Sequence, residues 1–105
     1  MSDEWFGARC IFRHADRGAY EERVTIWRAA SFDEAVASAE AEAAAYAGHL
    51  DNVEFTGLTQ AFHMFEAPAS GAEVFSLMRD SELDPDAYLN RFFDTGTERQ
   101  QIVPS

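Results

Sequence analysis

Two runs of alternating residues near the start of the chain predict a pair of strands. In residues 5–14, "WFGARCIFRH", apolar residues occupy every second position and arginines fall between them. Residues 20–29, "YEERVTIWRA", alternate in the same way, and the polar turn between the two runs contains Asp16 and Gly18. A period of two residues is typical of strands with one buried face. The two runs therefore predict an antiparallel hairpin.

A period of three to four residues then predicts a helix over residues 31–50. Ser31 is a favourable N-cap, Glu34 stands at the spacing of a capping box, and Gly48 is a suitable C-terminal stop. The expected apolar stripe consists of Phe32, Val36, Ala39, Ala43, Tyr46 and Leu50. Because most of this stripe is alanine, the helix is expected to lie close against a sheet.

Strand patterns return in residues 53–66, "VEFTGLTQAFHMFE". Val53 and Phe55 share one phase of the alternation, whereas Leu58, Phe62 and Met64 share the other. Gly57 lies where the phase changes, and a glycine inside a strand pattern often marks a bulge. We therefore expect a β-bulge at Gly57.

Residues 72–79, "AEVFSLMR", predict a fourth strand, and Asp84 followed by Pro85 predicts the start of a second helix. The predicted element order is β-β-α-β-β-α. An α+β fold, with one four-stranded antiparallel sheet and helices on one face, is the simplest arrangement of these elements. We expect residues 1–96 to form a single domain and residues 97–105 to form a C-terminal tail.

The second face of this predicted sheet is expected to be apolar. In most registers it receives Trp5, Ile11, Trp27 and at least one of Phe62 and Phe65. Contiguous apolar patches larger than a few hundred Å² are uncommon on monomeric proteins. We therefore predict a homodimer that packs sheet on sheet or extends an edge strand.

The charge balance narrows the choice of partners. Nineteen Asp and Glu residues oppose eight Arg, and the chain has no lysine, so its formal net charge is −11. Such a field repels nucleic acids and anionic membranes and favours a basic protein partner. Cys10 is the only cysteine, the N-terminal residues are acidic, and no long apolar segment is present, so we expect a cytoplasmic protein.

Four segments of the chain resemble a small bacterial family. They are the pair Trp5-Phe6, "YEERV" at 20–24, "ASFDEAVASAEAEAAAY" at 30–46 and "GAEVFSLMR" at 71–79. Taken together they are similar to the domain-of-unknown-function 4288 family over roughly residues 5–79. Leu77 stands where members of that family often carry arginine. The resemblance implies an α+β fold, and the family has no established activity to carry over.

The stretch "DSELDPDAY", residues 80–88, places four carboxylates within seven positions. An EF-hand calcium loop requires glycine at its sixth position and a bidentate glutamate at its twelfth. Pro85 and Arg91 occupy those positions here. Helix capping and the helix dipole account for most of these acids, so we expect a cap and no calcium site.

Histidine and cysteine do not cluster in the sequence. His14, His49 and His63 lie far apart, and Cys10 and His14 on one strand are separated by roughly 13 Å at about 3.3 Å per residue. We expect Cys10 to be a buried core thiol. No metal, cofactor or catalytic residue set is predicted, and an enzymatic role is not favoured.

The residues predicted to form an interface or bind a ligand are Trp5, Arg9, Glu21, Arg23, Trp27, His63 and Phe65. Glu21 and Arg23 share one face of their strand, and we expect this pair to take part in ion pairs across strands or an interface, with Glu21 facing Arg9 or Arg13.

These features favour two functions. The first is a non-catalytic, dimeric domain that binds a protein, in an accessory role or as an inhibitor or immunity-type protein. The second is a small-molecule pocket between the aromatic sheet face and its dimer mate, lined by Trp5, Trp27 and His63.

Overall fold

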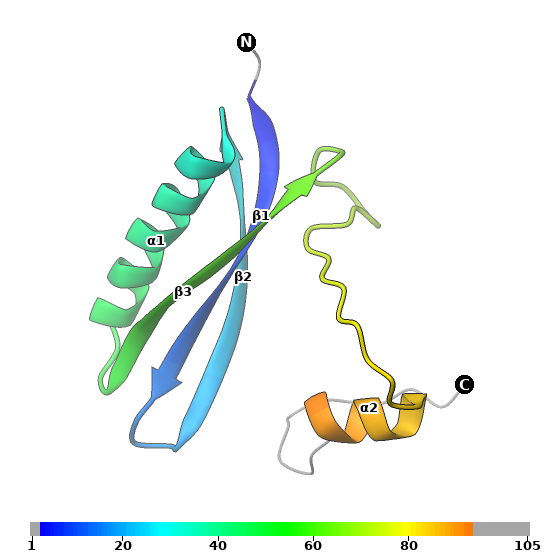
Figure 1. Ribbon diagram of the computed structural model, residues 1–105. Helices are drawn as coiled ribbons and strands as arrows, with labels where there is room; N and C mark the ends of the chain where they lie inside the picture. The colour runs from blue at the N-terminus through cyan, green and yellow to red at the C-terminus, as the bar shows by residue number, and fades with distance from the viewer. Residues whose placement is uncertain (1–2, 94–105) are drawn as a thin grey trace.

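The computed structural model describes residues 3–93, which form a three-stranded antiparallel sheet and two helices (Figure 1). The elements in chain order are β1 (Glu4–His14), β2 (Ala19–Ala29), α1 (Phe32–Gly48), β3 (Val53–Met64) and α2 (Pro85–Phe92). The strand order is β2-β1-β3, so the first strand lies in the centre of the sheet. The predicted hairpin, the central helix, the third strand and the second helix are all present, and the α+β class is confirmed.

Alternation along β1 separates the two faces of the sheet. Phe6, Ala8, Cys10 and Phe12 are buried and point toward α1. We call this side the helix face, and the opposite side, which carries Trp5, Gly7, Arg9, Ile11 and Arg13 on β1, the open face. The pairing of Phe12 with Glu21 and with Phe55 places the odd-numbered residues of β2 and β3 on the helix face as well.

The helix packs onto the sheet through alanine. Ala35, Ala39, Ala43 and Ala47 are buried at intervals of four residues, so the helix axis can approach β1 closely. The predicted N-cap is confirmed, because the Ser31 hydroxyl accepts a hydrogen bond from the amide of Glu34 at 3.1 Å.

The predicted apolar stripe was wrong at its two ends. Phe32 and Leu50 are each more than 40% exposed, and Ala35 and Ala47 take the buried positions. The buried stripe is thus the alanine row itself, because small side chains allow closer packing of the helix on the sheet than Phe32 or Leu50 would.

The predicted fourth strand is absent from the described residues, and the prediction of a four-stranded sheet was wrong. Residues 73–83 lie outside every strand, and no backbone hydrogen bond joins them to the sheet. Apolar residues fall on both phases of this segment, Val74 and Met78 on one and Phe75 and Leu77 on the other. The alternation therefore does not define a single face that a sheet position would bury.

The prediction that both helices cover one face was also wrong. Figure 1 shows α1 on one side of the sheet and the segment leading to α2 on the other. Among the described residues, α2 contacts none of the strands and does not contact α1. Its predicted start is confirmed, because an Asp84 carboxylate oxygen accepts a hydrogen bond from the amide of Ala87 at 2.9 Å. The predicted tail, residues 97–105, lies outside the described residues.

The predicted bulge is present in β3, but it does not change the phase of the strand. Cys10 pairs with Thr59 and Phe12 with Phe55, so residues 56–58 stand opposite the single residue Ile11. Gly57 takes a positive φ of 94° there. Because the insertion is an even number of residues, the odd-numbered positions stay on the helix face on both sides of it. The strand keeps its phase, and its large apolar residues occupy odd-numbered positions before the bulge and even-numbered positions after it.

Candidate functional site

The open face of the sheet carries apolar side chains that the described chain leaves exposed. Along β2 the even-numbered residues are exposed, whereas the odd-numbered residues from Glu21 to Trp27 are half-buried. Tyr20, Val24 and Ile26 are 68%, 44% and 40% exposed. Exposed β-branched and aromatic residues in a row on a strand are typical of a surface that meets another polypeptide.

One short segment crosses the open face at Gly7. The carbonyl oxygen of Val74 lies 1.6 Å from the position that a β-carbon on Gly7 would occupy, so any side chain at this position would clash with the backbone of the segment. Gly7 is buried although it faces away from α1. We call residues 73–75 the crossing segment; it lies against the central strand because Gly7 has no side chain.

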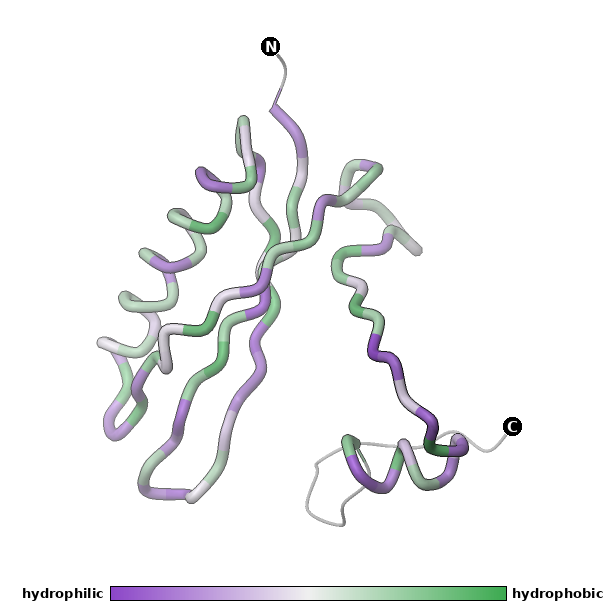
Figure 2. Tube along the Cα trace, viewed as in Figure 1, coloured by the Kyte–Doolittle hydropathy of each residue, from purple (hydrophilic) through white to green (hydrophobic). Residues whose placement is uncertain are grey.

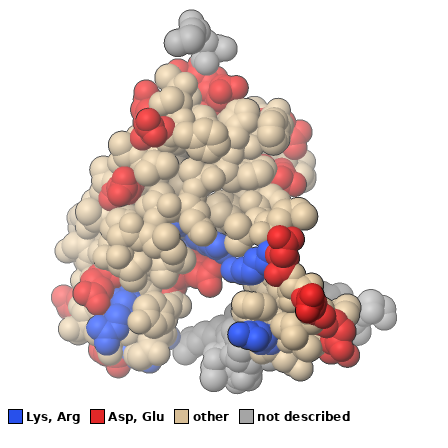
Figure 3. All heavy atoms as spheres, viewed as in Figure 1, with Lys and Arg blue, Asp and Glu red and all other residues tan. Residues whose placement is uncertain are grey.

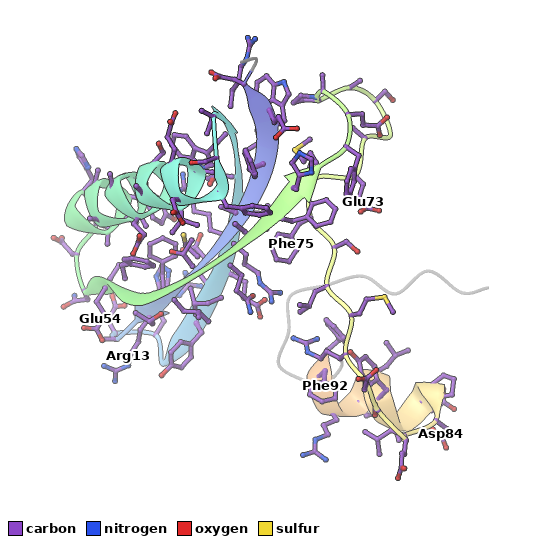
Figure 4. All side chains as sticks on the ribbon, turned by 45° about the horizontal axis from the view of Figure 1, so that its top comes forward. Arg13, Glu54, Glu73, Phe75, Asp84 and Phe92 are labelled. Atoms are coloured by element: carbon purple, nitrogen blue, oxygen red, sulfur yellow. The ribbon has the colours of Figure 1, made fainter. Side chains whose placement is uncertain are left out.

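Arg9 lies at the centre of the open face and connects all three strands. Its Nε donates a hydrogen bond to Oε1 of Gln60 on β3 at 3.0 Å, and its NH1 donates to Oε1 of Glu22 on β2 at 3.1 Å. The Phe75 ring of the crossing segment lies 5.0 Å from the guanidinium carbon. Phe75 also lies 6.2 Å from the ring of Phe62 (Figure 4). The crossing segment is therefore held by one cation–π contact and one aromatic contact.

Charge on the open face differs from that of the chain as a whole. The charged residues of its three strands are Arg9, Arg13, Arg28, Glu22 and Glu54. Arg13 pairs with Glu54 at 3.3 Å across β1 and β3, and both side chains are more than half exposed (Figure 4). Three arginines against two glutamates give the strands of the open face one excess positive charge, which Glu73 of the crossing segment offsets, on a chain whose net charge is −11. In the view of Figure 3, acidic groups lie scattered around the outline and basic groups lie toward its lower part.

The structure places Glu21 and Arg23 on the helix face, so they do not pair with Arg9 or Arg13. The expectation that they share a face is confirmed, but the predicted partners were wrong because Arg9 and Arg13 point to the other side of the sheet. Arg23 forms an ion pair with Glu42 of α1. The predicted pairing ignored the helix as a source of partners for β2.

A polar network joins the hairpin to α1 along the edge of the helix face. The Tyr46 hydroxyl donates to the Glu21 carboxylate at 3.0 Å, and Nε2 of His14 lies 2.9 Å from the same carboxylate. The Arg23 guanidinium lies over the Tyr46 ring at 3.9 Å. The hydrogen bond to Glu21, with burial of the phenol, raises the pKa of Tyr46 above its ordinary value. The hydrogen bond to Glu42 likewise raises the pKa of Arg23. This network attaches the helix to the sheet.

The three residues predicted to line a small-molecule pocket do not converge. Trp27 lies on the helix face, where it packs against both buried clusters and donates from Nε1 to the Thr25 hydroxyl at 2.7 Å. His63 lies on the same face, with Nε2 3.2 Å from Glu4 and its ring 5.3 Å from that of Phe6.

Trp5 lies on the open face, on the opposite side of the sheet from Trp27 and His63. Phe65 follows β3 and is 85% exposed, with its ring 4.9 Å from that of His63. Of the predicted set, only Trp5 and Arg9 lie on the open face.

A shallow hollow of about 210 Å³ lies where β3 ends and the crossing segment begins. Phe62, Phe65, Glu66 and Glu73 line it, so its aromatic floor has an acidic rim. A second hollow of about 190 Å³ lies at the other end of β3, beside Arg13 and Glu54. Both are small compared with ordinary ligand pockets of about 300–1,000 Å³.

Six residues that shape the open face were not predicted as site residues from the sequence: the exposed row Tyr20, Val24 and Ile26, and Gly7, Gln60 and Phe75. Gly7 had a usable signal, because a glycine within an aromatic-rich strand indicates close approach of another backbone. The sequence contains no such signal for Gln60 and Phe75, since their role depends on the position of Arg9 in the folded sheet.

No group of three or more metal-binding side chains occurs within residues 3–93, and no helix in that range is long and apolar enough to cross a membrane. No family model, curated protein or solved structure matches the chain. The resemblance to the domain-of-unknown-function 4288 family stays a prediction. The geometry of the open face is therefore the strongest indication of function.

Proposed function

We propose that this chain is a non-catalytic protein-binding domain that works as a homodimer through the open face of its sheet. The observation that carries this proposal is the exposed row Tyr20, Val24 and Ile26 beside the central Arg9. Apolar residues surrounded by arginine and glutamate have the composition of a protein interface, with an apolar centre and a polar rim. Cavities of about 200 Å³ support a protein ligand rather than a small molecule.

A basic protein is the proposed partner of the acidic remainder of the surface. The outer side of α1 carries Asp33, Glu34 and Glu40, and Asp51 follows the helix. The open face carries no net charge, so the two surfaces suit different partners: the open face a second copy, and the acidic surface a basic protein. An accessory, inhibitor or immunity-type role in the cytoplasm fits this division. The test is affinity purification from the native host at low salt. Recovery of no protein partner would count against the proposal of a basic partner.

The dimer is tested by placing charge on the open face. We expect the double variant Val24→Asp/Ile26→Asp to change the molar mass in light scattering from that of two chains to that of one, because two carboxylates would be buried at the apolar centre of the interface. Leu50→Asp is the matched control, since Leu50 is also about 41% exposed but lies beyond the end of α1. A monomeric wild type at micromolar concentration would refute the proposal.

A further inference from the structure

The chain after the crossing segment forms an arm that carries apolar side chains away from its own sheet. We call residues 76–93 the arm. Figure 2 shows hydrophobic residues in this part of the chain as well as in the strands. Its exposed apolar residues are Leu77, Met78, Leu83, Leu89, Phe92 and Phe93, and Met78 is 90% exposed. Such a surface is costly to leave in water.

The end of the arm is an ordered unit. The Tyr88 and Phe92 rings pack in a tilted arrangement, with centroids 4.7 Å apart and an interplanar angle of 45°. The Arg79 guanidinium lies 5.3 Å from the Phe92 ring, and its NH1 donates to the Tyr88 hydroxyl at 3.4 Å. Asp84 caps the helix. The arm therefore presents a preformed aromatic surface, and Figure 4 shows Asp84 and Phe92 well away from the sheet.

We propose that the arm binds the open face of a second copy of this chain, and that the two copies exchange arms. A single copy leaves two apolar surfaces exposed, the arm and the row Tyr20, Val24 and Ile26. A twofold exchange covers both at once, since each chain supplies one arm and one open face. This inference rests on the proposed homodimer and names the segment that fills its interface.

The charge of the open face favours this occupant. The arm carries Asp80, Glu82, Asp84 and Asp86 against Arg79 and Arg91 among its described residues. The strands of the open face carry one more arginine than glutamate, with Arg28 and Arg13 toward opposite ends, and Glu73 of the crossing segment offsets this excess. An acidic arm on this face therefore meets less repulsion than it would on the rest of a chain whose net charge is −11.

The dimensions of the arm also fit. Between Phe75 and Asp84 the chain is irregular and extended, and nine residues reach roughly 30 Å at about 3.3 Å per residue. That reach exceeds the roughly 20 Å from Gly7 to Arg13 along β1. The crossing segment and arm together contain about the 20–30 residues that one side of a standard interface uses.

The test compares four full-length proteins and one truncation by light scattering and analytical ultracentrifugation. Wild type, Leu89→Asp/Phe92→Asp in the arm, Val24→Asp/Ile26→Asp on the open face and the control Leu50→Asp are all full-length. A chain ending at Phe75 removes the arm but keeps the crossing segment. Circular dichroism and a thermal melt verify that each variant is folded.

We expect the arm variant, the face variant and the truncation each to raise the dissociation constant of the dimer by roughly thirtyfold or more, as loss of buried anchors does. The control is expected to leave it unchanged. A benzophenone amino acid at Leu89, in a mixture of ¹⁴N and ¹⁵N chains, is expected to give cross-links between chains to the peptide containing Tyr20–Ile26.

The possible failures are distinguishable. If the face variant disrupts the dimer but the truncation and the arm variant leave it intact, the arm exchange is overturned. The proposed homodimer would still stand in that case. Cross-links from Leu89 to Tyr20–Ile26 only within one chain would also overturn the exchange, since the arm would then fold back on its own sheet. A wild type that is monomeric at micromolar concentration would overturn both.

Discussion

One face of the sheet is covered by α1, whereas the other is crossed, among residues 3–93, by the crossing segment of residues 73–75. On the helix face, Phe6 and Phe12 are fully buried and each contacts further aromatic rings. On the open face, Gly7 is buried, while Tyr20, Val24 and Ile26 remain exposed. The difference teaches that this chain buries one side of the sheet against its own helix and leaves a row of apolar side chains exposed on the other.

The largest difference between the two faces is expected in the free energy of unfolding lost when an aromatic residue is replaced by alanine. Phe12→Ala should lower the free energy of unfolding by about 3–5 kcal/mol, because it leaves a cavity between Tyr46 and Phe55. Tyr20→Ala on the open face is the matched variant, and it should change stability by less than about 0.5 kcal/mol under conditions in which the protein is monomeric. Urea denaturation monitored by circular dichroism measures both. Equal losses would show that the two faces are equally well packed.

A smaller effect is expected where the crossing segment meets the sheet. Gly7→Ala should displace Val74 and cost about 1–3 kcal/mol, since a β-carbon at Gly7 would overlap the Val74 carbonyl. The NMR chemical shifts of residues 73–75 should then change. Gly48→Ala is the control, because no atom lies within 4 Å of its new β-carbon and up to about 1 kcal/mol of stabilisation is expected. Unchanged chemical shifts of residues 73–75 in Gly7→Ala would mean that the segment does not lie on Gly7.

The smallest effect is expected at the polar network on the helix face. Tyr46→Phe removes the hydrogen bond to Glu21 and should cost about 0.5–1.5 kcal/mol at neutral pH. Folding raises the pKa of Tyr46, so the stability gained from its neutral phenol is fully present below the pKa of the unfolded phenol, near 10, and is lost as pH rises through the higher folded pKa.

The wild type should therefore be more stable than Tyr46→Phe at neutral pH, and this difference in the free energy of unfolding should disappear above about pH 10. Urea titrations of both proteins at neutral and alkaline pH measure this difference, and the subtraction removes the contributions of the other tyrosines. A difference that stayed constant across this range would contradict the role of the phenol in holding α1 to the hairpin.

The local elements were predictable because short-range chemistry determines them. Alternation identified β1 and β2, the Ser31 and Asp84 caps set the starts of both helices, and Gly57 marked the bulge. In each case the signal and the structure lie within a few residues of each other. The calcium loop was rejected and a helix start expected in "DSELDPDAY", and the structure shows the cap at Asp84.

The failures arose where contacts span long distances in the sequence. Strand propensity in residues 72–79 predicted a fourth strand, but the position of Val74 over Gly7 draws this segment across the face rather than along β3. Trp27 was expected on the outer face, yet β1 pairing places it opposite Phe6 on the helix side. Alternation gives two faces, and only tertiary packing decides which one α1 covers.

The bulge in β3 has a consequence for how this protein tolerates changes in length. Three residues, Thr56, Gly57 and Leu58, stand opposite Ile11, and all three are exposed. Deleting two of them would leave a regular ladder with every side chain on its present face, whereas deleting one would move Val53 and Phe55 out of the core. This strand can therefore accept insertions or deletions of even length. The bulge is the position at which a probe peptide can be inserted without rebuilding the sheet.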